Sequence, residues 1–144
     1  MILYTIGFTK KSAETFFGLL KQPGLERIID VRYNNTSQLA GFTKRDDLAF
    51  FLRRLRGLDY VYLPELAPTK ESRDAYMKRG GDWEAYIAAY RALLDERCVA
   101  ETLDKSLFDG GCLLCSEATA DHCHRRLLAE YLAEHWGHIE IVHL

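Results

Sequence analysis

The chain has 144 residues, of which 48% are hydrophobic and 28% are charged, and this is the size and composition of one ordinary globular domain. Its 19 lysines and arginines are balanced by 21 aspartates and glutamates, which leaves a formal net charge of -2. This balance excludes a protein that coats nucleic acid through an overall positive charge, and no apolar run approaches the roughly 18 residues of a membrane span.

Short apolar runs alternate with longer amphipathic segments along the chain. In chain order, the pattern predicts a strand at 2–6, a helix at 12–21, a strand at 27–31, a helix at 47–56 and a strand at 60–63. Residues 64–81 look irregular apart from one helical turn near 73–77. A helix in two pieces is predicted across 83–108, followed by a strand at 112–115, a helix at 122–135 and a strand at 139–143.

This alternation predicts an α/β three-layer sandwich, with a mostly parallel sheet of about five strands and helices on both faces. We expect a single domain over residues 1–144. The apolar N-terminal run is too short for a signal peptide, so we expect a cytoplasmic protein whose cysteines are reduced. Ligands of such folds bind outside the carboxyl ends of the strands, and the segments after the strands are therefore the places to look for a site.

The segment after the fourth predicted strand holds the most titratable groups: Cys115, Glu117, Cys123, His124 and Arg125. The last three open a predicted helix, where unpaired N–H groups favour an anion and lower the pKa of a nearby thiol. We therefore predict that Cys115 or Cys123 is a reactive thiol and that Arg125 binds an anion. Glu117 or His124 would move a proton. The structural alternative is that the cysteines are plain core residues.

A metal site is the other interpretation of this cysteine-rich segment. Cys112 and Cys115 have the right residue type for zinc, but residues three apart on a strand face opposite sides of the sheet. The two cannot then chelate one ion, and we expect no bound metal. A smaller set, formed by Cys115, Cys123 and either His122 or His124, remains open.

The ends of the other strands add further candidates. Asp30 and Arg32 lie two residues apart and so share one face of the second predicted strand. Arg32 is a candidate anion ligand that Asp30 orients, and the alternative is an ion pair that ties the loop. Thr9 follows the first strand, and we expect it either to bind a ligand or to cap the next helix. Glu65 follows the third strand and is either an acid–base group or an ordinary surface residue.

Short motifs occur at these places in a fixed order: Thr5-Ile6-Gly7, Asp30-Val31-Arg32, Ser37, Gly41-Phe42, Tyr62-Leu63-Pro64-Glu65-Leu66, Leu113-Leu114-Cys115-Ser116-Glu117 and Cys123-His124-Arg125. Through them the whole sequence resembles the family known as domain of unknown function 488. The resemblance implies a small prokaryotic cytosolic α/β protein, and no reaction is attached to the family. It points to these site residues: Asp30, Arg32, Ser37, Glu65, Cys115, Glu117, Cys123, His124 and Arg125.

The sequence departs from the family pattern at its first turn, which usually reads Gly-His-Ser and here is Gly7-Phe8-Thr9. A phenyl ring has no group that titrates, so no base acts at that position. Because of this departure, the resemblance does not identify a substrate for this chain.

We therefore expect an anion-binding, cysteine-containing, enzyme-like cleft at the strand ends, with a small anionic ligand or a phosphate-containing substrate as its partner. We expect no cofactor and no membrane partner. One alternative is a nucleic-acid-linked binding module, in which Lys44, Arg45 and Lys78 contact phosphates without bond chemistry. The other alternative is a metal-binding structural domain.

Overall fold

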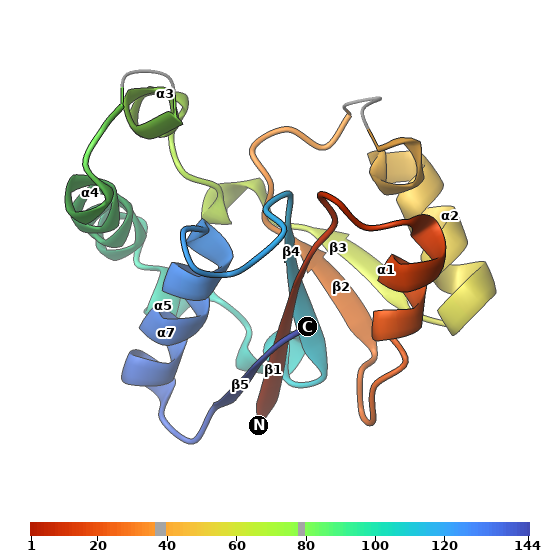
Figure 1. Cartoon of the computed structure of the whole chain (residues 1–144). Coiled ribbons are helices and arrows are strands. Elements are labelled where there is room, and N and C mark those ends of the chain that lie inside the picture. Colours follow the sequence, from red (N-terminus) through yellow and green to blue (C-terminus); the bar gives the residue numbers. More distant parts are fainter. Residues whose placement is uncertain (37–39, 78–79) are drawn as a thin grey trace.

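The computed structural model describes residues 1–36, 40–77 and 80–144, and a five-stranded parallel sheet lies at its centre (Figure 1). The strands are β1 (Ile2–Gly7), β2 (Arg27–Asp30), β3 (Asp59–Tyr62), β4 (Gly111–Cys115) and β5 (Glu140–His143). Their order across the sheet is β3-β2-β4-β1-β5. The prediction of an α/β fold with a parallel sheet is confirmed.

Helices cover both faces of the sheet, as predicted. They are α1 (Ala13–Leu19), α2 (Arg45–Arg56), α3 (Lys70–Met77), α4 (Trp83–Glu96), α5 (Val99–Thr102), α6 (Lys105–Phe108) and α7 (His124–Trp136), with 3-10 turns η1 (Gly41–Thr43) and η2 (Pro64–Leu66). Helices α1 and α2 lie on one face, and α4, α5 and α7 lie on the other (Figure 1). The three layers follow from this placement.

The central strands are apolar on both faces because each face is covered by helices. On β2, Ile28 packs into the core under α1 and α2, whereas its neighbour Ile29 packs into the core under α4 and α7. The same division separates Leu114 from Leu113 on β4. Successive side chains of a strand point to opposite faces, so adjacent apolar residues supply both cores.

Local signals set the helix ends. The Ser12 hydroxyl accepts a hydrogen bond from the Thr15 N–H and starts α1, and Gly57, with φ 66°, ends α2 in the left-handed conformation. The helical run predicted over 83–108 consists of three helices, α4, α5 and α6, and not of two. Cys98, with φ 50°, separates α4 from α5, and Asp104 caps the start of α6. The segment predicted as irregular contains the eight residues of α3.

The register of the sheet brings the strand ends together. β2 and β4 are parallel neighbours, with Asp30 opposite Leu114, and β1 pairs with β4 so that Gly7 lies opposite Cys115. The ends of the first, second and fourth strands therefore meet at one edge of the sheet. β2 and β4 thus run side by side in the same direction.

Within the described ranges, none of the helices combines the length and the apolar character that a membrane crossing requires.

At Gly7 the backbone of β1 closely approaches the segment that follows β4. A Cβ atom at this position would lie 1.6 Å from the Glu117 carbonyl oxygen and 2.4 Å from Nη1 of Arg125. Only a residue without a side chain leaves room for both groups.

We predict that Gly7→Ala lowers the free energy of unfolding by about 1–3 kcal/mol, because the added methyl group overpacks a backbone contact. The matched control is Gly18→Ala on α1, where an added Cβ meets nothing within 4 Å. That control should be neutral or stabilising by about 0.5–1 kcal/mol, since alanine favours a helix. Urea unfolding followed by circular dichroism measures both, and equal stabilities would contradict the packing described.

Candidate functional site

A pocket of about 50 Å³ lies at the carboxyl ends of β2 and β4. Its walls come from the residues after β2, from α3 and α4, and from the segment between β4 and α7. The lining residues are Arg32, Tyr33, Asn34, Arg73, Tyr76, Met77, Tyr86, Cys115, Ser116, Glu117, His122, Cys123 and His124. Five of the predicted site residues thus share one pocket: Arg32, Cys115, Glu117, Cys123 and His124.

Asp30 is fully buried at the end of β2 and holds Arg32 in place. Its carboxylate accepts hydrogen bonds from Nε and Nη2 of Arg32, both at 2.9 Å, and from the Arg32 backbone N–H at 3.1 Å. The Tyr60 hydroxyl and the Asn35 amide also donate to it. Burial and the Asp30 carboxylate raise the pKa of Tyr60, which therefore remains a donor at neutral pH.

The paired guanidinium of Arg32 is nearly buried, with 5% of the residue exposed, and its Cζ atom lies 5.5 Å from the centre of the Phe8 ring. Because Asp30 binds one edge of the Arg32 guanidinium, the position of this guanidinium in the pocket wall is fixed. Asp30 orients Arg32 through an ion pair, and of the two residues only Arg32 lines the pocket. Anion binding by Arg32 stays a prediction.

Arg125 has no exposed surface and lies beneath the pocket instead of lining it. Its Nη1 donates to the Glu117 carbonyl at 2.7 Å and to Sγ of Cys115 at 3.2 Å, and its Nε donates to Oγ1 of Thr5 at 3.3 Å. The sequence predicted a ligand-binding arginine here. The structure instead places Arg125 as a tie between β1, the end of β4 and the start of α7.

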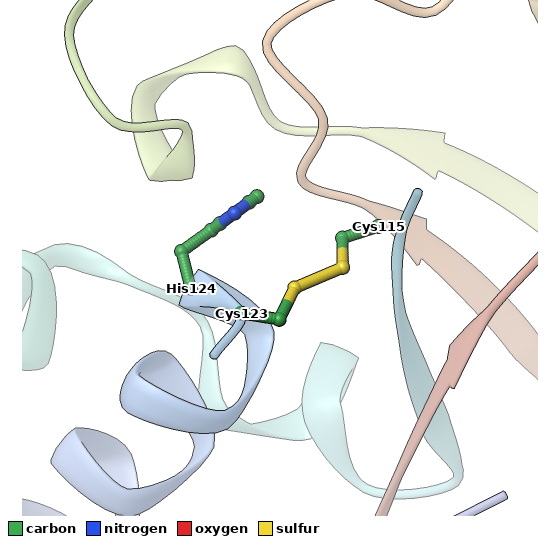
Figure 2. Close-up of side chains that lie close together, drawn as sticks. All are labelled: Cys115, Cys123 and His124. Atoms are coloured by element: carbon green, nitrogen blue, oxygen red, sulfur yellow. A yellow bond between two sulfur atoms is a disulfide. The ribbon is translucent and has the colours of Figure 1, made fainter. Parts of the chain in front are cut away.

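Cys115 and Cys123 are joined by a disulfide bond, with their Cα atoms 7.5 Å apart (Figure 2). Cys115 is the last residue of β4, and Cys123 directly precedes α7. The expectation that all cysteines are reduced is therefore wrong for this pair, while Cys98 and Cys112 are free thiols. The sequence could not show the pairing, because it depends on the path of residues 116–122 across the strand ends.

His124 is the first residue of α7 and lies beside the two sulfur atoms (Figure 2). Its Nε2 is 2.7 Å from the Val31 carbonyl oxygen, and a carbonyl only accepts, so Nε2 carries the proton. Burial lowers the pKa of His124 to about 4, although the bond to Val31 opposes the shift. The ring is thus neutral at pH 7, with the lone pair on Nδ1.

The remaining predicted site residues lie at or beyond the pocket rim. Thr9 donates its hydroxyl and its N–H to the Ser116 carbonyl, and the Glu117 side chain is exposed at the lip. Glu65 is exposed on η2 and does not line the pocket. Ser37 lies outside the described residues.

Sequence reasoning missed the wall that α3 and α4 contribute. Arg73 and Tyr76 project from α3 into the pocket, Tyr86 joins them from α4, and the Arg73 guanidinium lies 5.3 Å from the centre of the Tyr33 ring. The spacing of Arg73 and Tyr76, three residues apart on one helix face, was a signal that could have been used.

A wider groove of about 710 Å³ continues from the pocket. The two share Asn34, Arg73, Met77, Ser116 and Glu117. Lys10 and Lys11 add positive charge to the groove, and Glu117 is its only carboxylate among the described lining residues. The groove as a whole is therefore positive.

The family model described as "Domain of unknown function DUF488" matches residues 12–132. The chain belongs to the DUF488 family. The match confirms the resemblance seen in the motifs, and it includes every predicted site residue except Thr9. Searches for similar curated proteins and for similar solved structures found no match.

We predict that Asp30→Asn in this DUF488 protein lowers the free energy of unfolding by about 3–5 kcal/mol, because it leaves the buried Arg32 charge without its partner. Asp59→Asn is the matched control, since Asp59 is exposed at the start of β3. The control should change stability by less than about 0.5 kcal/mol. Chemical unfolding measures both, and similar losses in the two variants would contradict the role of Asp30.

Proposed function

We propose that this DUF488 protein binds a small oxyanion, a phosphate or carboxylate group, next to a reactive cysteine. The observation that carries the proposal is that two arginines, Arg32 and Arg73, line the same pocket as Cys115, Cys123 and His124. Guanidinium groups present planar donors that match the oxygens of phosphate and carboxylate. An anion between them would lie against the sulfur pair.

The size and charge of the pocket favour a small ligand group. Its volume of about 50 Å³ corresponds to roughly four water-sized spheres, which suits a tetrahedral oxyanion. Arg32 is already paired with Asp30, so Arg73 contributes most of the positive charge that an anion would meet. The adjoining positive groove then offers room for the rest of a larger anionic molecule.

The cysteines supply the reactive group once they are reduced. Cys123 precedes the N-terminus of α7, which favours a thiolate through the helix dipole, and Nη1 of Arg125 donates to Sγ of Cys115. The neutral His124 ring has a lone pair that can accept a proton. These groups support an enzyme-like role for the pocket.

The nucleic-acid alternative has less support. Lys44 and Arg45 lie at the start of α2 and line neither the pocket nor the groove, and the Arg45 guanidinium lies 5.0 Å from the centre of the Tyr62 ring. Lys78 lies outside the described residues. Among the described residues that line the groove, only Lys10, Lys11 and Arg73 are basic and could contact the phosphates of a nucleic-acid strand.

Protection of the cysteines by inorganic phosphate tests the proposal. The protein is reduced with dithiothreitol, desalted into EDTA and alkylated with iodoacetamide, and each cysteine is followed by mass spectrometry. We expect phosphate at about ten times its Kd to slow alkylation of Cys115 and Cys123 by about tenfold. The exposed Cys98 is an internal control and should react at an unchanged rate.

Two matched variants locate the anion. Arg73→Gln should raise the Kd for phosphate about tenfold to a hundredfold, the value of a hydrogen bond to a charged group, so that most of the protection is lost at the same phosphate concentration. Arg54→Gln, which removes an exposed arginine on α2, should leave protection intact. Absence of protection by phosphate, sulfate or acetate at low salt, or equal protection in both variants, would overturn the proposal.

A further inference from the structure

We propose that the reduced Cys115–Cys123 pair and His124 form a zinc site whose fourth position opens into the pocket. The ligand atoms of these three residues all lie within 4.8 Å of one another. The inference goes beyond anion binding, because it depends on the sulfur and imidazole ligands and not on Arg32 and Arg73.

The donor set suits zinc. Two thiolates and one imidazole are the ligands that Zn²⁺ selects, and they usually surround it as a tetrahedron. With Zn–S bonds of about 2.3 Å and Zn–N bonds of about 2.0–2.1 Å, tetrahedral ligand atoms lie roughly 3.5–3.8 Å apart. Atoms already within 4.8 Å of one another reach that spacing through small side-chain rotations.

The backbone spacing of the two cysteines also suits a shared ion. Their Cα atoms are 7.5 Å apart, whereas disulfides usually span about 4.4–6.8 Å. An ion between two sulfur atoms lengthens the bridge, and it accommodates the wider spacing without movement of β4 or α7.

Two of the ligands already have the hydrogen bonds that metal ligands need. Nε2–H of His124 donates to the Val31 carbonyl at 2.7 Å, which leaves Nδ1 as the atom that can bind zinc. Metal-binding histidines commonly donate their second ring N–H to a carbonyl in this way. Nη1 of Arg125 donates to Sγ of Cys115 at 3.2 Å and would stabilise it as a thiolate ligand.

Zinc binding requires the disulfide to be opened first. A dithiol reduces it by thiol exchange: the dithiol becomes a disulfide, and Cys115 and Cys123 become two thiols. Zn²⁺ then replaces the two thiol protons, which are released to solvent. Three protein ligands leave one coordination position of the zinc ion free. Because all three ligand residues line the pocket, this free position faces the space where an anion would bind.

Zinc titration of the reduced protein tests this inference. After reduction with dithiothreitol and anaerobic desalting, elemental analysis should find one zinc per chain, and Co²⁺ in its place should give a sulfur-to-cobalt charge-transfer band. The oxidised protein should bind at least tenfold more weakly. Cys123→Ser and His124→Gln should also lose at least tenfold in affinity, with circular dichroism confirming that both variants fold.

Cys98→Ser and His135→Gln, at an exposed histidine of α7 that does not line the pocket, are the matched controls and should bind zinc as the parent does. Equal binding by oxidised and reduced protein, unchanged affinity in Cys123→Ser, or a cobalt spectrum without the sulfur band would overturn the inference. Arg73→Gln should still bind zinc, and phosphate protection is measured in EDTA, so the anion site and the zinc site can fail separately.

Discussion

The geometry of the site depends on the hydrogen bonds of the buried Arg125 guanidinium. A buried charge is tolerated only when its donors are satisfied, and Arg125 meets this requirement through Thr5 on β1 and through Cys115 and Glu117 at the end of β4. Because Arg125 belongs to α7, these bonds fix the start of that helix above the strand ends. Cys123 is brought to Cys115 as a consequence.

A second buried charge fixes the opposite wall of the pocket. The Asp30 carboxylate engages Arg32 along one edge and is itself held by Tyr60 on β3. His124 connects the two walls, since its ring bonds to the Val31 carbonyl after β2 while its backbone begins α7. The pocket is therefore bordered by side chains whose positions are set by buried hydrogen bonds, as a pre-organised binding site requires.

The sequence was sufficient to predict the sheet and to place several candidate residues at the same end of it. Apolar runs such as Ile28-Ile29 and Leu113-Leu114 indicate strands buried on both faces, and the parallel sheet that follows brings Arg32 and Cys115 to one edge. The prediction that Cys112 and Cys115 face opposite sides is also confirmed, because Cys112 packs in the core under α1 and α2 while Cys115 lines the pocket.

Other features depend on tertiary contacts that the sequence pattern does not encode. Arg125 looked like a free cation at a helix start, and only the close approach at Gly7 shows that it points inward. The polar segment of α3 has no buried residue, so its pattern did not predict that Arg73 and Tyr76 would form a wall. Glu65 follows a strand as predicted, but η2 leaves its side chain exposed away from the pocket.

The central claim is that an oxyanion binds between Arg32 and Arg73 against the sulfur pair. The most direct measurement is anomalous diffraction at the selenium edge from a crystal of this protein soaked in selenate, a tetrahedral dianion that can be located without ambiguity. The account predicts a selenium peak within hydrogen-bonding distance of both guanidinium groups, which disappears when Arg73 is replaced by glutamine. Selenium peaks confined to surface lysines, with only water between the two arginines, would contradict it.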